Sequence, residues 1–186
     1  MKNYIVGYGS LISRESRLGT GGFRKCIPVN VIGFRREWNV VIPEERATYL
    51  GVVNSESYNF NGVIFSISEG DLEKFDKRET KYYERILVDE ENIKFLSSKI
   101  DLDDSKIWLY VTRDPQAPSK KYPILRSYVN TVLSGVLRLD KEFYREFIKT
   151  TFNWEIIYED LDNPRYPYSV ESEEILLNKQ MLSKLE

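Results

Sequence analysis

Glu79 is the residue whose type and position best fit acid–base chemistry. It closes segment 69–79, which is rich in charged residues and lacks proline and β-branched residues, so the segment is predicted to be helical. On such a helix Leu72, Phe75 and Glu79 share one face, which places the carboxylate on an apolar stripe. Burial there raises the pKa of a carboxyl group toward the range of a general base. Glu79 is therefore a candidate general acid and base.

A purely structural role for Glu79 stays open at this level. A carboxylate that faces the core is costly unless it is paired or has a function. The helix could end before Glu79 and leave the side chain in solvent. Otherwise the carboxylate could pair with one of three nearby cations, Arg78, Lys81 or Arg85.

A second candidate site lies at the first turn of the chain. The apolar run 4–7 predicts a strand, and Tyr8-Gly9-Ser10-Leu11 follows it as a turn. Because glycine lets the backbone turn tightly, successive N–H groups can converge on an anion. This pattern predicts a loop that binds a small acidic ligand. The alternative is a tight strand-to-helix connection that binds nothing.

The elements that would position these residues begin with short strands in the first two thirds of the chain. Stretches rich in β-branched and aromatic residues predict strands at Cys26–Phe34, Trp38–Ile42, Tyr49–Val53, Asn61–Ile67, Arg85–Val88 and Lys106–Val111. Together with the first strand they favour a curled, mixed sheet.

Helices are predicted in the last third. Pro123 can start a helix, and its buried stripe would consist of Ile124, Tyr128, Val132, Leu133 and Val136. A second amphipathic helix is predicted over 141–150. The cluster Gly19-Thr20-Gly21-Gly22 is interpreted as a flexible loop near the site. The fold class expected is thus a single α/β (α+β) domain, with a curled mixed β-sheet or small barrel flanked by helices.

Length and charge limit the organisation and the partners. A chain of 186 residues with 41% hydrophobic residues can form one sizeable core, and it contains no credible domain linker. We expect one domain over 1–170, with 171–186 as a charged helix or tail of the same domain. The 27 basic and 29 acidic residues give no electrostatic case for nucleic-acid binding. No apolar run is long enough to span a membrane and no signal-peptide pattern is present, so we expect a cytoplasmic protein without membrane contact.

The absence of histidine excludes several chemistries. Without His, the chain cannot build a Ser-His-Asp or Cys-His nucleophilic site. Its one cysteine, Cys26, leaves it without the usual zinc or copper ligands, and it is expected to be a buried thiol. No phosphate-binding or dinucleotide motif occurs. We therefore expect neither metal nor cofactor, and acid–base work must fall to carboxylates, Lys or Tyr.

Taken together and in order, the motifs resemble the γ-glutamylcyclotransferase superfamily, which includes ChaC-type glutathione-degrading enzymes and AIG2-like proteins. The matching segments are Tyr8-Gly9-Ser10-Leu11-Ile12, 33–38, 62–65 and the stretch 76–85 around Glu79. Segment 127–135 also resembles a helix of bacterial members, and segment 163–168 resembles a closing loop of the family. The likeness spans roughly residues 4–168. Many members have Asn at the position of Leu11, and glycines often stand at the positions of Thr80 and Lys81, so the substrate's side-chain preference does not transfer.

The resemblance implies an activity and roles for both candidate sites. The α-amine of a γ-glutamyl compound would attack its own γ-carbonyl, forming 5-oxoproline and releasing the attached amine. Tyr8, Gly9, Ser10 and Leu11 would bind the substrate, and Glu79 would be the catalytic acid and base, with no cofactor. The leaving group could be an amino acid, a peptide, an amine or the dipeptide part of glutathione. A catalytically silent module that binds a small anion or metabolite on the same fold is the alternative.

Overall fold

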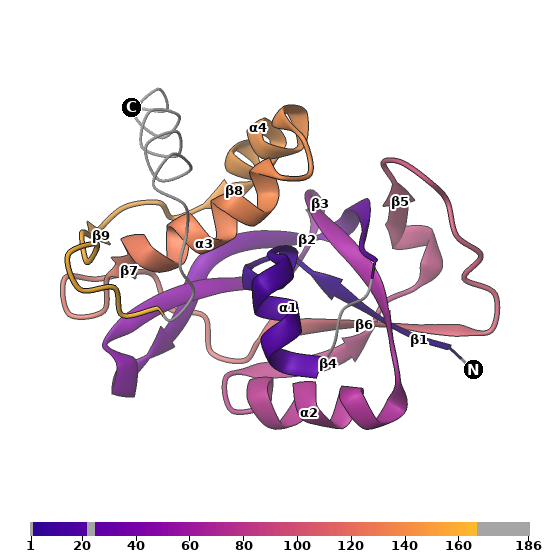
Figure 1. The fold of residues 1–186 in the computed structure, drawn as a ribbon, viewed down its shortest axis with the longest axis horizontal. Helices are drawn as coiled ribbons and strands as arrows, with labels where there is room; N and C mark the ends of the chain where they lie inside the picture. Colours follow the sequence, from indigo (N-terminus) through magenta and orange to yellow (C-terminus); the bar gives the residue numbers. More distant parts are fainter. Residues whose placement is uncertain (1, 22–24, 167–186) are drawn as a thin grey trace.

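The computed structural model describes residues 2–21 and 25–166, which form one mixed sheet with helices packed against it (Figure 1). The strands are β1 Lys2–Gly7, β2 Ile27–Ile42, β3 Ala47–Ile67, β4 Tyr83–Leu87, β5 Ile93–Phe95, β6 Ser105–Thr112, β7 Ile124–Leu125, β8 Thr151–Phe152 and β9 Ile157–Tyr158. The α-helices are α1 Arg14–Gly21, α2 Glu69–Glu79, α3 Arg126–Leu137 and α4 Lys141–Lys149. Short 3₁₀ helices are η1 Ser10–Ile12, η2 Pro43–Glu45 and η3 Glu90–Asn92. The predicted tail 171–186 lies outside the described residues.

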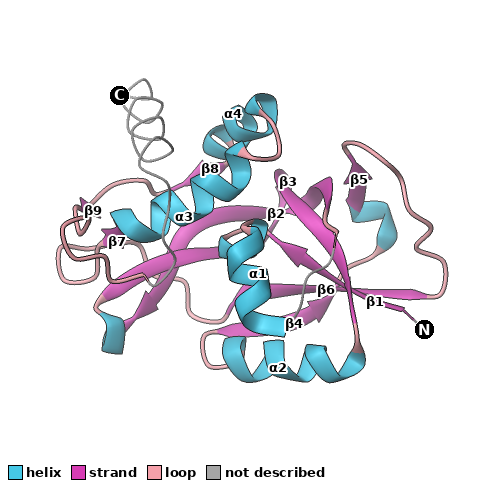
Figure 2. Ribbon diagram, in the orientation of Figure 1, coloured by secondary structure: helices cyan, strands magenta, loops and turns pink. Residues whose placement is uncertain are grey.

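The sheet runs in the order β4-β6-β1-β3-β2-β5 (Figure 2). The shorter β8 pairs with β2, β7 pairs with β3, and β9 pairs with β7. The pairing is mixed, because β1 is antiparallel to β3 and parallel to β6. Side chains of β1 alternate between two cores: Ile5 packs with residues of α2, α3 and α4, whereas Tyr4 and Val6 pack in a core built from strands and their connections. A curled mixed sheet flanked by helices, as expected from the sequence, is thus confirmed.

Two long strands replace four predicted short ones. β2 and β3 pair antiparallel from Ile27 opposite Ile64 to Ile42 opposite Ala47. The polar stretches that resembled turns, 35–37 and 54–59, lie within these strands. Their backbone groups are hydrogen-bonded through the pairing of β2 with β3. Two register shifts interrupt the ladder, and Gly33, with φ of 90°, lies at the first of them.

Two predictions about helices need correction. The predicted glycine loop begins inside α1, which starts after Ser13 and continues to Gly21, while Gly22 lies outside the described residues. The helix expected from Pro123 begins only at Arg126, because Ile124 is drawn into strand β7 by pairing with Thr48 and Ile157. The predicted apolar stripe is nevertheless buried, and α4 ends one residue before the predicted boundary.

Helix α2 has the predicted bounds. Ser68 caps it, since the Ser68 hydroxyl accepts a hydrogen bond from the Asp71 amide at 3.2 Å. Leu72 and Phe75 are buried in the core shared with the sheet, which fixes the helix face on which Glu79 lies.

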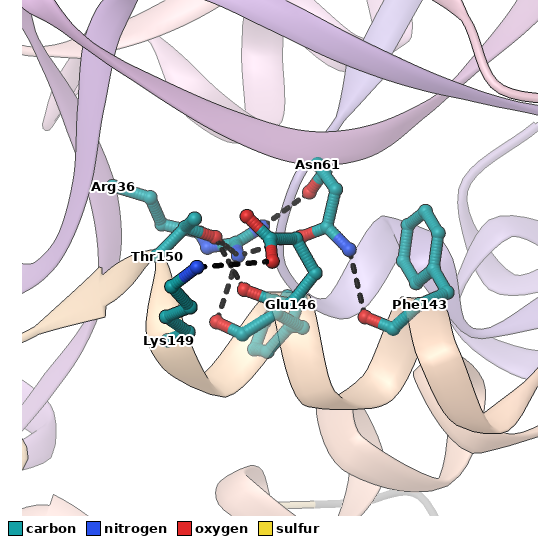
Figure 3. Close-up of polar contacts among 7 residues, drawn as sticks. Arg36, Asn61, Phe143, Glu146, Lys149 and Thr150 are labelled. Atoms are coloured by element: carbon teal, nitrogen blue, oxygen red, sulfur yellow. Dashed lines mark hydrogen bonds and ion pairs between the residues drawn. The ribbon is translucent and has the colours of Figure 1, made fainter.

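A buried arginine fastens α4 to the sheet (Figure 3). Arg36 on β2 is completely buried, and its guanidinium donates to the Thr151 hydroxyl at 2.8 Å and to the Phe147 carbonyl and the Thr150 hydroxyl at 3.0 Å. The guanidinium carbon lies 3.6 Å from the centre of the Phe147 ring. This places a cation at the C-terminal end of α4, where helix carbonyls lack partners and the helix dipole is negative.

Asn61 on β3 completes this cluster. Its side-chain oxygen accepts from Arg36 at 3.0 Å, and its side-chain nitrogen donates to the Phe143 carbonyl at 2.7 Å. Figure 3 also shows the ion pair between Lys149 and Glu146, which are 3.9 Å apart and partly in solvent. The cluster holds α4 in place with neutral acceptors around a charged donor.

Candidate active site

The two regions singled out in the sequence meet at one cavity. The cavity has a volume of about 40 Å³. It is lined by Val6, Tyr8, Gly9, Ser10, Leu11, Leu50, Glu79, Tyr83, Tyr110 and Tyr128. These residues come from β1 and the turn after it, β3, the end of α2, β4, β6 and α3. The curl of the sheet therefore brings Glu79 to the same cavity as Tyr8, Gly9, Ser10 and Leu11.

Glu79 is largely buried and has one ion-pair partner among the described residues. Its side chain is 15% exposed, and its Oε1 lies 3.0 Å from Nε of Arg78. Burial raises the pKa of the Glu79 carboxyl group, and the Arg78 charge opposes this rise without cancelling it. The structure thus combines both outcomes weighed from the sequence, a carboxylate at the cavity and a pair with Arg78.

The turn after β1 is held by its own backbone hydrogen bonds and by contact with α3. Its 3₁₀ helix closes with the Ile12 amide donating to the Gly9 carbonyl at 2.9 Å. The Tyr128 hydroxyl of α3 lies against this turn, where the Ser10 backbone opposes the rise that burial causes in the Tyr128 pKa. Within the described residues, the amides of Gly9 and Leu11 make no hydrogen bond, so they are the two donors of this turn that a ligand could use.

Close packing explains why glycines stand at this turn. A Cβ atom on Gly9 would lie 3.1 Å from the Tyr128 hydroxyl oxygen and 3.5 Å from Cβ of Leu50, so a larger side chain would enter the cavity wall. A Cβ atom on Gly135 of α3 would lie 2.7 Å from the Cα and N atoms of Ser13. Gly135 therefore allows α3 to approach the turn closely enough for Tyr128 to reach it.

Three of the tyrosines use their hydroxyl protons in hydrogen bonds within the protein. Tyr8 donates to the Tyr110 carbonyl at 2.7 Å, and Tyr83 donates to the Leu50 carbonyl at 2.9 Å. Tyr110 donates to Oδ1 of Asp76 at 2.9 Å. With their protons engaged, these phenols offer only oxygen lone pairs to a ligand. Together with the Glu79 carboxylate they form a surface of acceptors suited to a group with several N–H donors.

Protonation states follow from burial. Burial raises the pKa of the Tyr8 and Tyr83 hydroxyls well above its ordinary value, and the same cause raises the pKa of Tyr110 and Tyr128. These phenols therefore stay neutral near pH 7, and the carboxyl group of Glu79 is the lining group suited to exchange a proton there.

Tyr83, Tyr110 and Tyr128 were not identified as site residues from the sequence. Tyr128 was assigned to a buried stripe, which is correct, but helical periodicity cannot show that its hydroxyl reaches the turn after β1. Tyr110 was placed in a strand, and alternation does not tell which face lies over a cavity. Tyr83 follows Glu79 closely, and this proximity was the one available signal.

Other kinds of site are not found in the described parts of the chain. Across residues 2–21 and 25–166, no group of three His, Cys, Asp or Glu residues is arranged to hold a metal ion. Cys26, expected to be buried, is a free thiol that is partly exposed, because it lies just before β2 begins. In the described ranges, no helix combines the length and hydropathy needed to cross a membrane.

Similarity to known proteins was found at the level of structure. No protein-family model and no curated protein matches the sequence. A γ-glutamyl cyclotransferase structure is similar over 97% of this chain and 99% of its own, with a TM-score of 0.63 and 13% identity. A protein from Homo sapiens gives a TM-score of 0.60 with 14% identity, over 96% of this chain and 98% of its own. A yeast γ-glutamyl cyclotransferase specific to glutathione gives a TM-score of 0.51 with 10% identity, over 98% of this chain and 96% of its own.

These similarities extend over nearly the whole of each chain, so they concern the complete arrangement of sheet and helices. With identities this low, they establish the architecture. The cavity between the turn after β1 and the end of α2 therefore lies in a protein that has the γ-glutamyl cyclotransferase fold.

Proposed function

We propose that the protein cyclises γ-glutamyl compounds, releasing 5-oxoproline and the amine attached to the γ-carbonyl. The observation that carries this proposal is the position of Glu79, a largely buried carboxylate with a raised pKa, at the same cavity as the turn after β1. The γ-glutamyl cyclotransferase fold supports it.

The reaction needs one bond to form and one to break. The substrate's α-nitrogen attacks the γ-carbonyl carbon to close a five-membered ring, and the bond from that carbon to the leaving nitrogen breaks. Ring closure removes two protons from the α-ammonium group, and both end on the released amine, which leaves as its ammonium ion. Glu79 accepts these protons from the α-nitrogen and returns them to the leaving nitrogen, so the carboxylate is restored after each turnover. Folding the substrate back on itself makes the attack intramolecular, which removes much of the entropic cost.

The lining residues suit the two ends of a glutamyl group. The lone pairs of Tyr8, Tyr83 and Tyr110 can accept from the α-ammonium group. The amides of Gly9 and Leu11 can donate to the α-carboxylate or to the oxyanion that develops at the carbonyl. A cavity of about 40 Å³ holds a few water molecules, so lining side chains must move to admit a substrate.

The leaving group is the open part of this proposal. One structure with the same fold is a yeast enzyme specific to glutathione, so glutathione is one of the compounds to test beside γ-glutamyl amino acids and γ-glutamyl amines. A cytoplasmic location is part of the proposal, since the one cysteine, Cys26, is free and a reducing compartment keeps it so.

A catalytically silent binding module is the second candidate function. The contact between Arg78 and Glu79 favours it, because a carboxylate held in an ion pair is a weaker base. Such a module would bind a γ-glutamyl compound or another amino acid in the same cavity without changing it.

A screen of γ-glutamyl compounds for 5-oxoproline release tests the proposal. The panel should contain glutathione, several γ-glutamyl amino acids and γ-glutamyl amines, each with the wild-type protein and with Glu79→Gln. Release that depends on Glu79 supports the enzyme. Binding by calorimetry without any release would support the silent module.

A further inference from the structure

Arg17 of α1 is a buried cation directly behind the turn that lines the cavity. The residue is 6% exposed, and its Nη1 donates to the Leu11 carbonyl at 2.7 Å and to the Ile12 carbonyl at 2.8 Å. Its guanidinium carbon lies 5.9 Å from the centre of the Phe65 ring. Leu11 lines the cavity and Arg17 does not, so the guanidinium contacts the backbone of a lining residue without lining the cavity itself.

Within the described parts of the chain, no neighbouring anion balances the charge of Arg17. Among the described residues, no carboxylate forms an ion pair with it, and its Nε is buried without a hydrogen-bond acceptor. Burying a cation is costly when no anion compensates it. Since charges in a protein interior interact over longer distances than in water, an anion in the cavity would relieve this cost without touching the guanidinium.

The bonds to Leu11 and Ile12 also orient the turn. They occupy both carbonyl oxygens with a cationic donor, which reduces the repulsion that these oxygens would exert on an anion near the turn. The Leu11 amide has no protein acceptor among the described residues. Arg17 thus holds the backbone of the turn by hydrogen bonds and also places a positive charge beside it.

We propose that Arg17 is a positioning and specificity-determining residue, which holds the turn after β1 and makes this end of the cavity selective for a carboxylate over a neutral group of the same shape. The proposal rests on the proposed function, in that the carboxylate is the α-carboxylate of a γ-glutamyl compound. Arg17 acts through the backbone of the turn and through its charge, without contacting the substrate.

Two substitutions separate these effects. Arg17→Gln keeps a side-chain N–H donor for the carbonyls and removes the charge, whereas Arg17→Lys keeps the charge. The readout is the ratio of kcat/KM for a γ-glutamyl dipeptide to that for the same compound with the glutamyl α-carboxylate converted to an amide. We expect Arg17→Gln to lower this ratio about tenfold or more, through KM, because an interaction with a charged group is lost. Arg17→Lys should keep the ratio within about threefold.

Binding measurements make the test independent of turnover. The dissociation constants of both ligands are measured by calorimetry on three proteins: Glu79→Gln alone, Glu79→Gln combined with Arg17→Gln, and Glu79→Gln combined with Arg17→Lys. Arg145→Met, which removes an exposed arginine on α4, is the control and should leave the binding of both ligands unaffected. Thermal melts show whether each variant is folded.

The possible results are distinguishable. If the wild type releases no 5-oxoproline but its binding preference for the carboxylate depends on Arg17, the proposed function fails and the inference stands. If the wild type is active and folded Arg17→Gln keeps the full preference, the inference is wrong and the function stands. A protein that binds neither ligand would contradict both.

Discussion

Glu79 and Arg36 are both charged residues withdrawn from solvent, but their surroundings differ. Among the described residues, the hydrogen-bond acceptors of Arg36 are neutral groups supplied by β3, the end of α4 and β8. Figure 3 shows two of the residues that supply them, Asn61 and Thr150. Arg36 does not line the cavity beside Glu79. Glu79 has Arg78 as its ion-pair partner and otherwise faces a cavity lined by phenol oxygens. A buried charge whose hydrogen bonds are complete within the protein stabilises packing. A buried charge that faces a cavity is available to a ligand.

Substituting each charge in turn tests this comparison. Loss of the Glu79 charge should remove activity and leave stability nearly intact. Loss of the Arg36 charge should lower stability and leave the activity of the folded protein nearly intact.

The largest effect is expected for Glu79→Gln. Glutamine keeps the shape of the side chain beside Leu72 and Phe75 but cannot accept and return a proton near neutral pH. Turnover should fall by about a hundredfold to ten-thousandfold, the usual contribution of general acid–base catalysis. The measurement is 5-oxoproline release, with a thermal melt of the same preparation expected to change little. Glu73→Gln, on the exposed side of α2, is the matched control, and a fully active Glu79→Gln would rule out the catalytic role.

Arg36→Met should lower stability strongly. The substitution removes the donor for the Thr150 and Thr151 hydroxyls and for the Phe147 carbonyl, and leaves these buried acceptors without it. We expect a loss of at least about 3 kcal/mol in the free energy of unfolding, measured by urea denaturation. Below its melting temperature, the folded variant should keep the wild-type kcat. A variant with unchanged stability and lost turnover would reverse the comparison.

Gly9→Val should weaken substrate binding more than Ser10→Ala does. A Cβ on Gly9 already approaches the Tyr128 hydroxyl, so valine would displace the wall between the turn and α3. We expect KM to rise about tenfold or more for Gly9→Val and only several-fold for Ser10→Ala, which removes one hydroxyl group. Steady-state kinetics on both folded variants would decide, and equal, near-normal KM values would show that the turn only connects β1 to α1.

The raised pKa of Glu79 has opposite consequences for activity and for stability. Activity should rise with pH through the folded-state pKa, because the carboxylate is the form that accepts a proton. Stability should change the other way, because the Glu79 carboxyl group binds its proton more tightly in the folded state than in the unfolded state. The stability that this proton contributes is complete below the pKa of the unfolded state, and it is lost as pH rises through the pKa of the folded state. Urea denaturation across this window should show Glu79→Gln gaining stability relative to the wild type as pH rises. The same pH slope in both proteins would contradict the assignment.

Local patterns predicted the elements that depend on short-range periodicity. The bounds of α2 follow from the composition of its segment, and the inward face of Glu79 and the buried stripe of α3 follow from 3.6-residue spacing; all three were confirmed. The division of β2 and β3 was wrong because polar stretches inside a strand look like turns when the partner strand is not known. The start of α3 was wrong because pairing of Ile124 with Thr48 depends on a segment distant in sequence.

The sequence by itself determined that acid–base chemistry must rest on carboxylates, lysines or tyrosines, since the chain has no histidine and one cysteine. It also determined which helix face carries Glu79 and where the first turn lies. Only the tertiary structure decided that these two regions share a cavity, that Tyr83, Tyr110 and Tyr128 complete it, and that Arg17 stands behind its turn. The physical reason is that periodicity fixes the direction of a side chain relative to its own helix or strand, whereas a cavity forms where the curled sheet brings distant segments together.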